Sequence, residues 1–597
     1  MFDDLPADVL LTILSFLCLS DISTLFSTTK YLNNFISQNS FSIYRSIAIF
    51  QFGVPSQLSY PDSLRYPPFD FHDFSPRAIS THNYGYTTWP TLCARLNQIR
   101  HSWRGTHSSA ITIHRNTGDG AVHRFKVDEN AGFIVSTTKH GGVVATDLDG
   151  PYGAWTRRKP RVRPFAHCEY SHGYLIFDRL GTKEVWRLTD YRYYYPSDPP
   201  VSVVPESQPD DWQHASAEQA YVAPPPPPVG VSIRPRKGHF TPHALLHPPT
   251  RTRAFRFIYP YLLVASWNSA YIYDVRSGVV VQQLNNIQDP PPNLSNEPLG
   301  DLSYVEHSPQ HVFICGELSV RVFTRSSGSS GGGGGQCVLS IPAVHDNYGR
   351  HRYTIQNARD NRSRDMNWVI GKVPDTTAQG QQHQEGDWEK VGSVLYRHHL
   401  VREHDRVRKF VDQIAAAHAS PCGNYLALLL ETSRLLLVRD LHRIIAGQTS
   451  LYENTIEVQL GTPSRFSKYL AFEYGRVGVA TRNGIFIVIP PPNFFSSQLP
   501  LDEPPAVLRV HPLNDSFVLA CVSCLQITPT GLYVNWSPHC PLARLPNAGE
   551  EGEGHGDGQQ HHRRNIHALQ EEVFWSGLET ELSVGYQDNG YAFVQEE

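Results

Sequence analysis

A stretch near the middle of the chain decides the expected fold. From Tyr259 to Gly278 it reads YPYLLVASWNSAYIYDVRSG. An apolar run leads into a short turn of Trp, Asn and Ser, and a second run ends in a polar residue before an Arg-Ser-Gly turn. Short apolar runs bounded by Gly, Asn, Asp and Ser are typical of antiparallel strands joined by hairpins. The stretch therefore predicts the two middle strands of a propeller blade.

Similar hairpin units recur along the chain after Ile111. They lie at 133–149, 174–189, 311–328, 424–440, 477–489, 517–536 and 582–594. Many are roughly 40 to 60 residues apart, close to the period of WD40-type repeats. Eight hairpins predict an all-β propeller of seven or eight blades. Pairing a last strand near Val594 with an early one near Ile111 would close the ring and remove sheet edges. A β-sandwich is the alternative fold.

The hairpin units resemble WD40 repeats. Asp274-Val275 and Arg439-Asp440 match the end of the third strand in that family, although the Trp-Asp signature itself does not occur. Three biased segments interrupt the repeat, near 190–250, 326–410 and 547–564. The first contains the proline run 224–228 and the second begins with a Gly/Ser linker at 326–335. Such compositions do not build a packed core, so we expect disordered insertions.

The first 52 residues carry a helical pattern instead. Apolar residues recur at spacings of three and four, which places them on one face of a helix: Leu5, Val9, Leu10, Ile13, Leu14 and Leu17. Pro6 and Asp8 suit the first turn of that helix, and Ser20-Asp21 would cap the next. Two further apolar segments follow at 22–26 and 31–36. Three short helices bury little surface among themselves, so a partner is implied.

In order and spacing, this segment resembles the F-box motif over roughly residues 3–50. The matching positions are Leu5-Pro6, Val9-Leu10, Ile13-Leu14, Leu17, Asp21-Ile22, Leu25, Thr28, Lys30 and Leu32. The resemblance implies docking onto Skp1, the adaptor of a cullin-RING (SCF) ubiquitin ligase. The residues expected to contact Skp1 are Leu5, Pro6, Val9, Leu10, Ile13, Leu14, Leu17, Asp21 and Leu25. An ordinary helical cap on the following domain is the alternative.

The chain is thus divided into three parts. Residues 1–52 are the expected F-box, 53–110 a connector, and 111–597 the WD40-like propeller. Within the connector, apolar residues at helical spacing predict a helix over 89–103. Its Arg95, Arg100 and Arg104 are expected to face solvent or acidic neighbours.

Composition narrows the functional classes. A net charge of -4 over 597 residues gives no global field that would attract nucleic acid or an anionic membrane. Nine scattered cysteines suit a reducing compartment better than a disulfide framework. Asp3, Asp4 and Asp8 argue against a signal peptide, and Asp21 interrupts the apolar run too early for a membrane helix. We therefore expect a cytoplasmic or nuclear protein.

No catalytic, cofactor or metal site is predicted. Cys521 and Cys524 with His539 and Cys540 could form a zinc set, but the odd spacing of the first pair on an apolar strand favours buried structural cysteines. A His-rich tract, which includes His561 and His562, is expected to be a solvated loop. The fold would then serve binding and not catalysis, and a propeller enzyme is disfavoured.

Basic loops between the blade units are the one binding signal in the propeller. The strongest candidates for substrate contacts are Arg157, Arg158, Lys159, Arg161 and Arg163, and a second cluster spans 234–237. Guanidinium groups bind phosphate and carboxylate through two parallel hydrogen bonds. Relatives that join an F-box to a WD40 propeller read phosphorylated peptides in this way, so an unknown, phosphorylated protein substrate is expected. A solvated charged loop is the alternative.

Together these features predict the substrate-recognition subunit of an SCF ubiquitin ligase. The F-box would dock Skp1 and the propeller would hold the substrate for ubiquitination by other subunits. The alternative is a scaffold that uses both parts for protein assembly without ubiquitin ligase activity.

Overall fold

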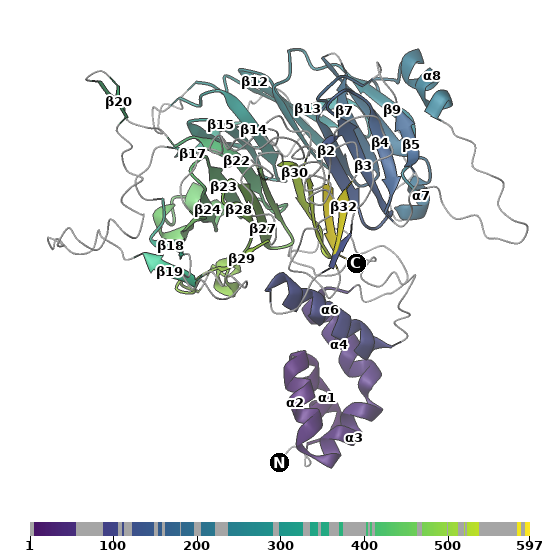
Figure 1. Ribbon diagram of the computed structural model, residues 1–597, viewed down its shortest axis with the longest axis vertical. Coiled ribbons are helices and arrows are strands. Elements are labelled where there is room, and N and C mark those ends of the chain that lie inside the picture. Colours follow the sequence, from purple (N-terminus) through teal and green to yellow (C-terminus); the bar gives the residue numbers. More distant parts are fainter. Residues whose placement is uncertain are drawn as a thin grey trace, which may run out of the picture.

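The computed structural model describes the following residues: 5–54, 88–105, 110–112, 122–148, 153–157, 162–179, 181–195, 204–220, 237–289, 298–325, 335–343, 348–356, 369–373, 401–403, 406–408, 412–461, 469–497, 499–510, 519, 522–536, 582–586 and 592–596. Among the described elements, five helices come first and most of the later elements are strands (Figure 1). Within these ranges no helix is long and apolar enough to cross a membrane.

The amino-terminal helices form a group that projects from the propeller (Figure 1). They are α1 (Ala7–Phe16), α2 (Leu19–Thr28), α3 (Lys30–Gln38) and α4 (Ser40–Phe52), followed by α6 (Trp89–Trp103). Local chemistry sets their ends: the Asp21 carboxylate accepts a hydrogen bond from the Cys18 amide at 3.3 Å, and Thr29 Oγ1 accepts one from the Leu32 amide at 3.1 Å. Gly53 ends α4 with a φ of 67°.

The sequence predicted three helices in residues 1–52, and the structure has four. The missed helix, α4, has buried Ile43 and Ile47 on one side but exposed Phe41 and Phe50 on others. The helix therefore carries apolar side chains on all sides. Its sequence lacks the spacing of three and four residues that places apolar residues on one face of a surface helix. The predicted helix at 89–103 is confirmed as α6.

Six sheets each contain the four antiparallel strands of a full blade. The first three are β2 (Val122–Asp128), β3 (Phe133–Thr138), β4 (Val143–Asp147) and β5 (Gly153–Arg157); β6 (Cys168–Ser171), β7 (Tyr174–Arg179), β8 (Thr182–Leu188) and β9 (Phe240–Leu246); and β10 (Ala254–Ile258), β11 (Tyr261–Ala265), β12 (Ser269–Asp274) and β13 (Val279–Asn285).

The other three full blades complete the arc. They are β14 (Leu302–His307), β15 (His311–Gly316), β16 (Ser319–Thr324) and β17 (Cys337–Pro342); β22 (Ile414–Ala419), β23 (Leu426–Leu430), β24 (Arg434–Val438) and β25 (Thr455–Gln459); and β26 (Tyr469–Glu473), β27 (Arg476–Thr481), β28 (Gly484–Ile489) and β29 (Ala506–Arg509). Buried apolar side chains fill the space between neighbouring blades.

The predicted seven or eight blades are not supported, because six full blades are seen. Six of the eight predicted hairpins are the middle two strands of a blade, as expected. The other two are the hairpin β30 (Val522–Ile527) with β31 (Leu532–Trp536), and β32 (Leu582–Tyr586) with β33 (Ala592–Glu596). The sequence of a hairpin does not show which two strands of a sheet it forms, or whether a full blade surrounds it. The number of hairpins therefore overestimates the number of blades.

The end of the chain closes the ring onto its start. β30 lies between β26 of the sixth blade and β2 of the first. The Gln526 side chain accepts a hydrogen bond from the Val127 amide at 2.9 Å and donates one to the Val127 carbonyl at 3.2 Å. The early strand β1 (Ala110–Thr112) pairs in parallel with β32, with Ile111 opposite Ser583. The expected partner of this early strand, the strand near Val594, pairs instead with β32.

Two of the expected disordered insertions contain regular structure, so that prediction was wrong for their described parts. The first holds α7 (Tyr191–Tyr194), α8 (Asp211–Ala220) and β9. The second holds β17, β18 (His351–Gln356), β19 (Val369–Val373), β20 (Val401–Glu403) and β21 (Arg406–Arg408). β9 and β17 are the outer strands of their blades, and part of an insertion separates each from its partner strand, β8 or β16. The proline run, residues 326–334 and the tract 547–564 lie outside the described residues.

Helix α6 joins the helices to the propeller through one continuous core, which includes Leu96, Ile485 and Val534. Trp103 Nε1 donates a hydrogen bond to the Pro529 carbonyl at 3.2 Å, and the Arg476 guanidinium lies 4.6 Å from the Trp103 ring centre. Arg100 does not face solvent as expected. Its guanidinium lies 4.3 Å from the Phe52 ring centre and donates to the Gln51 carbonyl.

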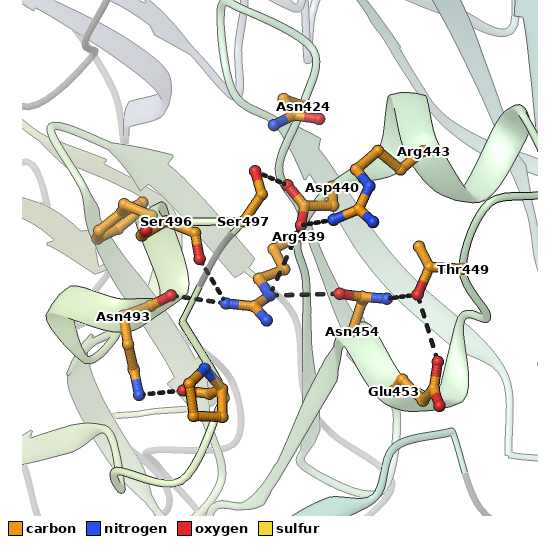
Figure 2. A network of polar contacts seen from close by, with 12 residues as sticks. Asn424, Arg439, Asp440, Arg443, Thr449, Glu453, Asn454, Asn493, Ser496 and Ser497 are labelled. Atoms are coloured by element: carbon orange, nitrogen blue, oxygen red, sulfur yellow. Dashed lines mark hydrogen bonds and ion pairs between the residues drawn. The ribbon is translucent and has the colours of Figure 1, made fainter.

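Arg439, from the Arg439-Asp440 pair, clamps the fifth blade to the sixth (Figure 2). It follows β24, and its guanidinium donates to the carbonyls of Asn493 at 2.6 Å and Ser496 at 2.9 Å. Both acceptors lie at the 3-10 helix η3 (Pro492–Phe495) between β28 and β29. Ser497 donates to the buried Asp440 carboxylate at 2.9 Å. One buried cation therefore satisfies carbonyl groups of the neighbouring blade.

We predict that Arg439→Met lowers the free energy of unfolding by about 3 kcal/mol, since it leaves the buried carbonyls of Asn493 and Ser496 without their donor and removes one of the two arginines beside Asp440. Urea titration of the full chain measures this value. Arg443→Met is the matched control, because its side chain is 37% exposed and lies 3.9 Å from Asp440. It should cost less than about 1 kcal/mol. Equal losses in the two variants would refute the clamp.

Candidate functional site

The innermost strand of each full blade lines the propeller axis, and β30 completes the ring between β26 and β2. The loops that lead into these strands open on one face, together with the turns between second and third strands. We call this the mouth face. The opposite face carries the turns between first and second strands, among them Pro529, where α6 attaches.

A cavity of about 540 Å³ runs along the axis from the mouth face. All seven innermost strands contribute to its lining, among them β2 with Arg124, β14 with Tyr304 and β26 with Tyr469. Its volume lies in the range of small-ligand and peptide-side-chain pockets. The axis is therefore hollow and connects an exposed rim with buried polar groups.

The rim of the cavity, which we call the mouth, is basic and aromatic. Arg163, Arg251 and Arg253 line it and are exposed. Phe165 is 55% exposed, and Trp267 beside the rim is 48% exposed. The Arg253 guanidinium lies 5.4 Å from the Trp267 ring centre. Exposed arginines and aromatic rings dominate binding energy at protein interfaces.

Just inside the mouth, Lys183 is buried and already neutralised. Its ammonium pairs with Asp178, donates to Thr252 Oγ1 at 3.0 Å and lies 4.4 Å from the Phe255 ring centre. Burial lowers the pKa of Lys183, and Asp178 opposes that shift. Because the charges of Lys183 and Asp178 cancel each other, the net positive charge of the mouth comes from its exposed arginines.

Deeper along the axis, each innermost strand contributes one polar side chain, and all of these except Glu306 line the cavity. We call this set the charge ring. Its members, in order around the axis, are Lys126, Glu169, Arg256, Glu306, His418, Glu473 and Gln526.

Positive and negative side chains alternate along most of the charge ring. The Glu169 carboxylate lies 3.0 Å from Lys126 Nζ and 3.4 Å from Arg256. Arg256 lies 3.1 Å from Glu306, whose other oxygen is 3.0 Å from His418 Nδ1. Burial alone would raise the pKa of Glu169 and Glu306, but Arg256 and their other basic neighbours hold both pKa values below the usual range. These carboxylates are therefore charged and paired.

The structure brings only part of the predicted basic loop to this site. Arg163 is at the mouth, Arg157 is the last residue of β5, and Arg158, Lys159 and Arg161 lie outside the described residues. From the second cluster, Lys237 forms an ion pair with Asp147 at 3.0 Å.

Sequence reasoning missed Arg251, Arg253 and the charge ring. The available signal was a single charged residue inside an apolar strand, as at Arg256 in β10. Such residues are almost never buried unless they are paired, so each required a partner from another strand.

Of the zinc set considered from sequence, only Cys524 is described. It lies on β30, and its thiol is 3.7 Å from the Phe125 carbonyl. Cys521, His539, Cys540 and the His-rich tract lie outside the described ranges. Where the structure describes the chain, no group of three or more His, Cys, Asp or Glu side chains could hold a metal.

A second surface lies on the amino-terminal helices. Its members are large apolar side chains that remain exposed, and we call them the helical surface: Val9, Phe16, Phe26, Tyr31, Phe41 and Phe50. Phe16 and Phe50 are 75% and 70% exposed, and their rings stack at 6.4 Å. Exposed apolar side chains that contact one another, as Phe16 and Phe50 do, mark interaction sites.

The residues predicted to contact Skp1 differ in how far this chain itself buries them. Leu10 and Leu14 are fully buried against other helices of this chain, and their contact with a partner stays a prediction. Helical spacing identified their face correctly, but the chain covers that face itself. The exposed members are Pro6, Val9 and Asp21, and the half-buried ones are Leu5, Ile13, Leu17 and Leu25.

Similarity to known proteins is found among solved structures and not among sequence families. No family model matches the chain, and no curated protein matches it. A solved structure described as "Crystal structure of RRP9 WD40 repeats" is similar, with 10% identity and a TM-score of 0.39 over 82% of this chain and 99% of that chain. The described strands form a WD40-like β-propeller with six full blades, as their own pairing demonstrates.

His307, beside Glu306 in β14, makes stability depend on pH. The side chain is buried, its Nε2 contacts the Tyr261 carbonyl at 3.0 Å, and burial lowers its pKa to about 4. The unfolded value is about 6.5. The unfolded chain thus binds a proton that the folded chain rejects, so stability present above pH 6.5 is lost as pH falls toward 4.

We predict that moving from pH 7.5 to pH 5 removes about 2 kcal/mol of stability through His307. Urea titrations at the two pH values measure the loss. In His307→Gln, which keeps a hydrogen-bond donor but does not titrate, the loss between the two pH values should be smaller by that amount. An unchanged loss would contradict the assignment.

Proposed function

We propose that this chain is the substrate-recognition subunit of an SCF ubiquitin ligase, in which the helices dock Skp1 and the propeller holds a protein substrate. One observation carries the proposal. Of the thirteen large apolar side chains that are exposed in the described chain, six lie on the short helical segment that resembles an F-box.

The helical surface needs a partner for a physical reason. Rings such as Phe16 and Phe50 gain roughly 25 cal/mol for every Å² of apolar surface that leaves water. The helices use their remaining apolar residues, including Leu10 and Leu14, for their own core. On this proposal Pro6, Val9 and Phe16 contact Skp1 directly, while Leu10 and Leu14 hold α1 in place.

The connection between the two parts supports a receptor role. α6 shares one core with both the helices and the propeller, and Trp103 is buried between them. The mouth opens on the face away from that junction. A rigid link would hold a bound substrate at a fixed distance from the adaptor, which raises the effective concentration of its lysines near the ubiquitin-carrying subunit. The bond-making chemistry would belong to other subunits.

Charge supports an acidic or phosphorylated substrate. The mouth carries three exposed positive side chains, Arg163, Arg251 and Arg253. The nearby Asp178 carboxylate does not offset them, because it pairs with Lys183. Guanidinium groups bind carboxylates and phosphates in pairs of hydrogen bonds. On this proposal the protein works in the cytoplasm or nucleus.

We predict that the full-length double variant Val9→Glu, Phe16→Glu loses binding to purified Skp1 in a pull-down. Both side chains are exposed, at 41% and 75%, so the charges should oppose docking without unfolding the helices. Leu10→Asp would instead place a charge in the core and would not separate the two effects.

Val281→Glu is the matched control, because this side chain is 47% exposed on the outer strand β13 of the propeller. It should bind Skp1 like the wild type. Equal capture of the double variant and the wild type, or no capture of the wild type, would refute the docking role. Ubiquitin transfer to a propeller-bound protein then distinguishes a ligase receptor from a scaffold.

A further inference from the structure

The charge ring is incomplete at Glu473. This residue ends β26, lines the cavity, and makes no hydrogen bond or ion pair with any described residue. Its two neighbours in the ring are engaged elsewhere. His418 contacts Glu306 at 3.0 Å. The Gln526 side-chain amide is used by the Val127 backbone: its oxygen accepts from the Val127 amide, and its nitrogen donates to the Val127 carbonyl.

Charge counting gives the same result. The ring holds two permanent cations, Lys126 and Arg256, and three carboxylates. Two of these carboxylates, Glu169 and Glu306, are paired at 3.0 to 3.4 Å. Burial raises the pKa of Glu473, and the more distant Arg256, Lys126 and His418 oppose this only in part. Arg124 also lines the cavity, but its guanidinium donates to the His123 and Ser523 carbonyls, so no cation of the charge ring pairs with Glu473.

Glu473 is reachable from the mouth. The same cavity is lined by Glu473 at depth and by the exposed Arg163 and Arg251 at the rim. Between them the wall carries the aromatic rings of Tyr304 and Tyr469. Aromatic faces attract ammonium and guanidinium groups. The Arg124 guanidinium already lies 5.3 Å from the Tyr469 ring centre, so an incoming cation on an extended side chain would meet the Tyr304 ring.

We propose that Glu473 receives the Lys or Arg side chain of a substrate peptide whose flanking acidic groups bind Arg163, Arg251 and Arg253 at the mouth. The proposal deepens the receptor function and rests on it, because it defines the class of substrate: a basic residue within an acidic context. The ring and mouth together supply one carboxylate at depth and three arginines at the rim, and the ligand would have the complementary pattern.

A ligand that carries both charges fits the cavity better than either of two simpler ligands. A purely acidic peptide would satisfy the mouth but would leave Glu473 buried without a cation. A small free cation would satisfy Glu473 but would leave the exposed Phe165 and Trp267 uncovered. A peptide that spans both levels satisfies both, and it buries the exposed aromatic rings.

The first test compares two neutralised carboxylates of the same ring in the full-length protein without ligand. Glu473→Gln should leave the urea midpoint unchanged or raise it, since it removes a charge that lacks a partner. Glu306→Gln should lower the midpoint, because it leaves Arg256 underpaired. If Glu473→Gln lowers the midpoint as Glu306→Gln does, Glu473 is a structural member of the ring and the proposal fails.

The second test pans a library of random nine-residue peptides on the full-length protein and on Glu473→Gln. The wild type should enrich peptides with one Lys or Arg between acidic residues, and the best of these should bind Glu473→Gln roughly thirtyfold more weakly. Replacing its Arg by the neutral citrulline should weaken binding to the wild type but not to the variant. No enrichment, or a basic preference that persists in Glu473→Gln, would overturn the proposal.

Free arginine amide is the control for a small-cation site. If it competes as well as the selected peptide at equal concentration, the mouth contributes nothing and the peptide proposal is wrong. The library can also be panned on Val9→Glu, Phe16→Glu, which leaves the propeller intact. Loss of Skp1 binding and loss of peptide selection are thus separate results, and each identifies which part of the function fails.

Discussion

The pairing of buried charges around the propeller axis constrains the rest of the structure. Lys126, Glu169, Arg256 and Glu306 come from four different blades, and none could remain buried and charged without the next. Each blade must therefore present its first strand in one register and at one distance from the axis. The apolar cores between blades supply most of the stabilisation, whereas these ion pairs determine which alignment of the blades is allowed.

Local chemistry made much of the fold predictable. The strand, turn and strand pattern at Tyr259–Gly278 is complete within one short segment, and so is the helical pattern of α6. The outer strands β9 and β17 were missed because each pairs with a strand separated from it by an insertion, so no nearby pattern marks the partner. The predicted number of blades was not supported for the same reason. The sequences of β30 and β32 look like middle strands, but distant partners determine where these strands lie.

The candidate sites were predictable to a smaller extent. A basic loop pointed to Arg163, yet Arg251 and Arg253 reach the same mouth from another blade, which only the closed ring brings together. On the helices, periodicity identified one apolar face but could not say what covers it. The chain itself covers Leu10 and Leu14, while Phe16 remains exposed. Burial by the chain and burial by a partner leave the same pattern in a sequence.

The closure between β2 and β30 has a consequence for biosynthesis. The contact of Val127 with Gln526 joins residues 399 positions apart, so the first blade cannot gain its second neighbour until β30 has left the ribosome. Until then the apolar side chains of the first blade that pack against β31, among them Phe125, lack this cover. The nascent protein therefore exposes this face of the first blade to aggregation until β30 and β31 have been made.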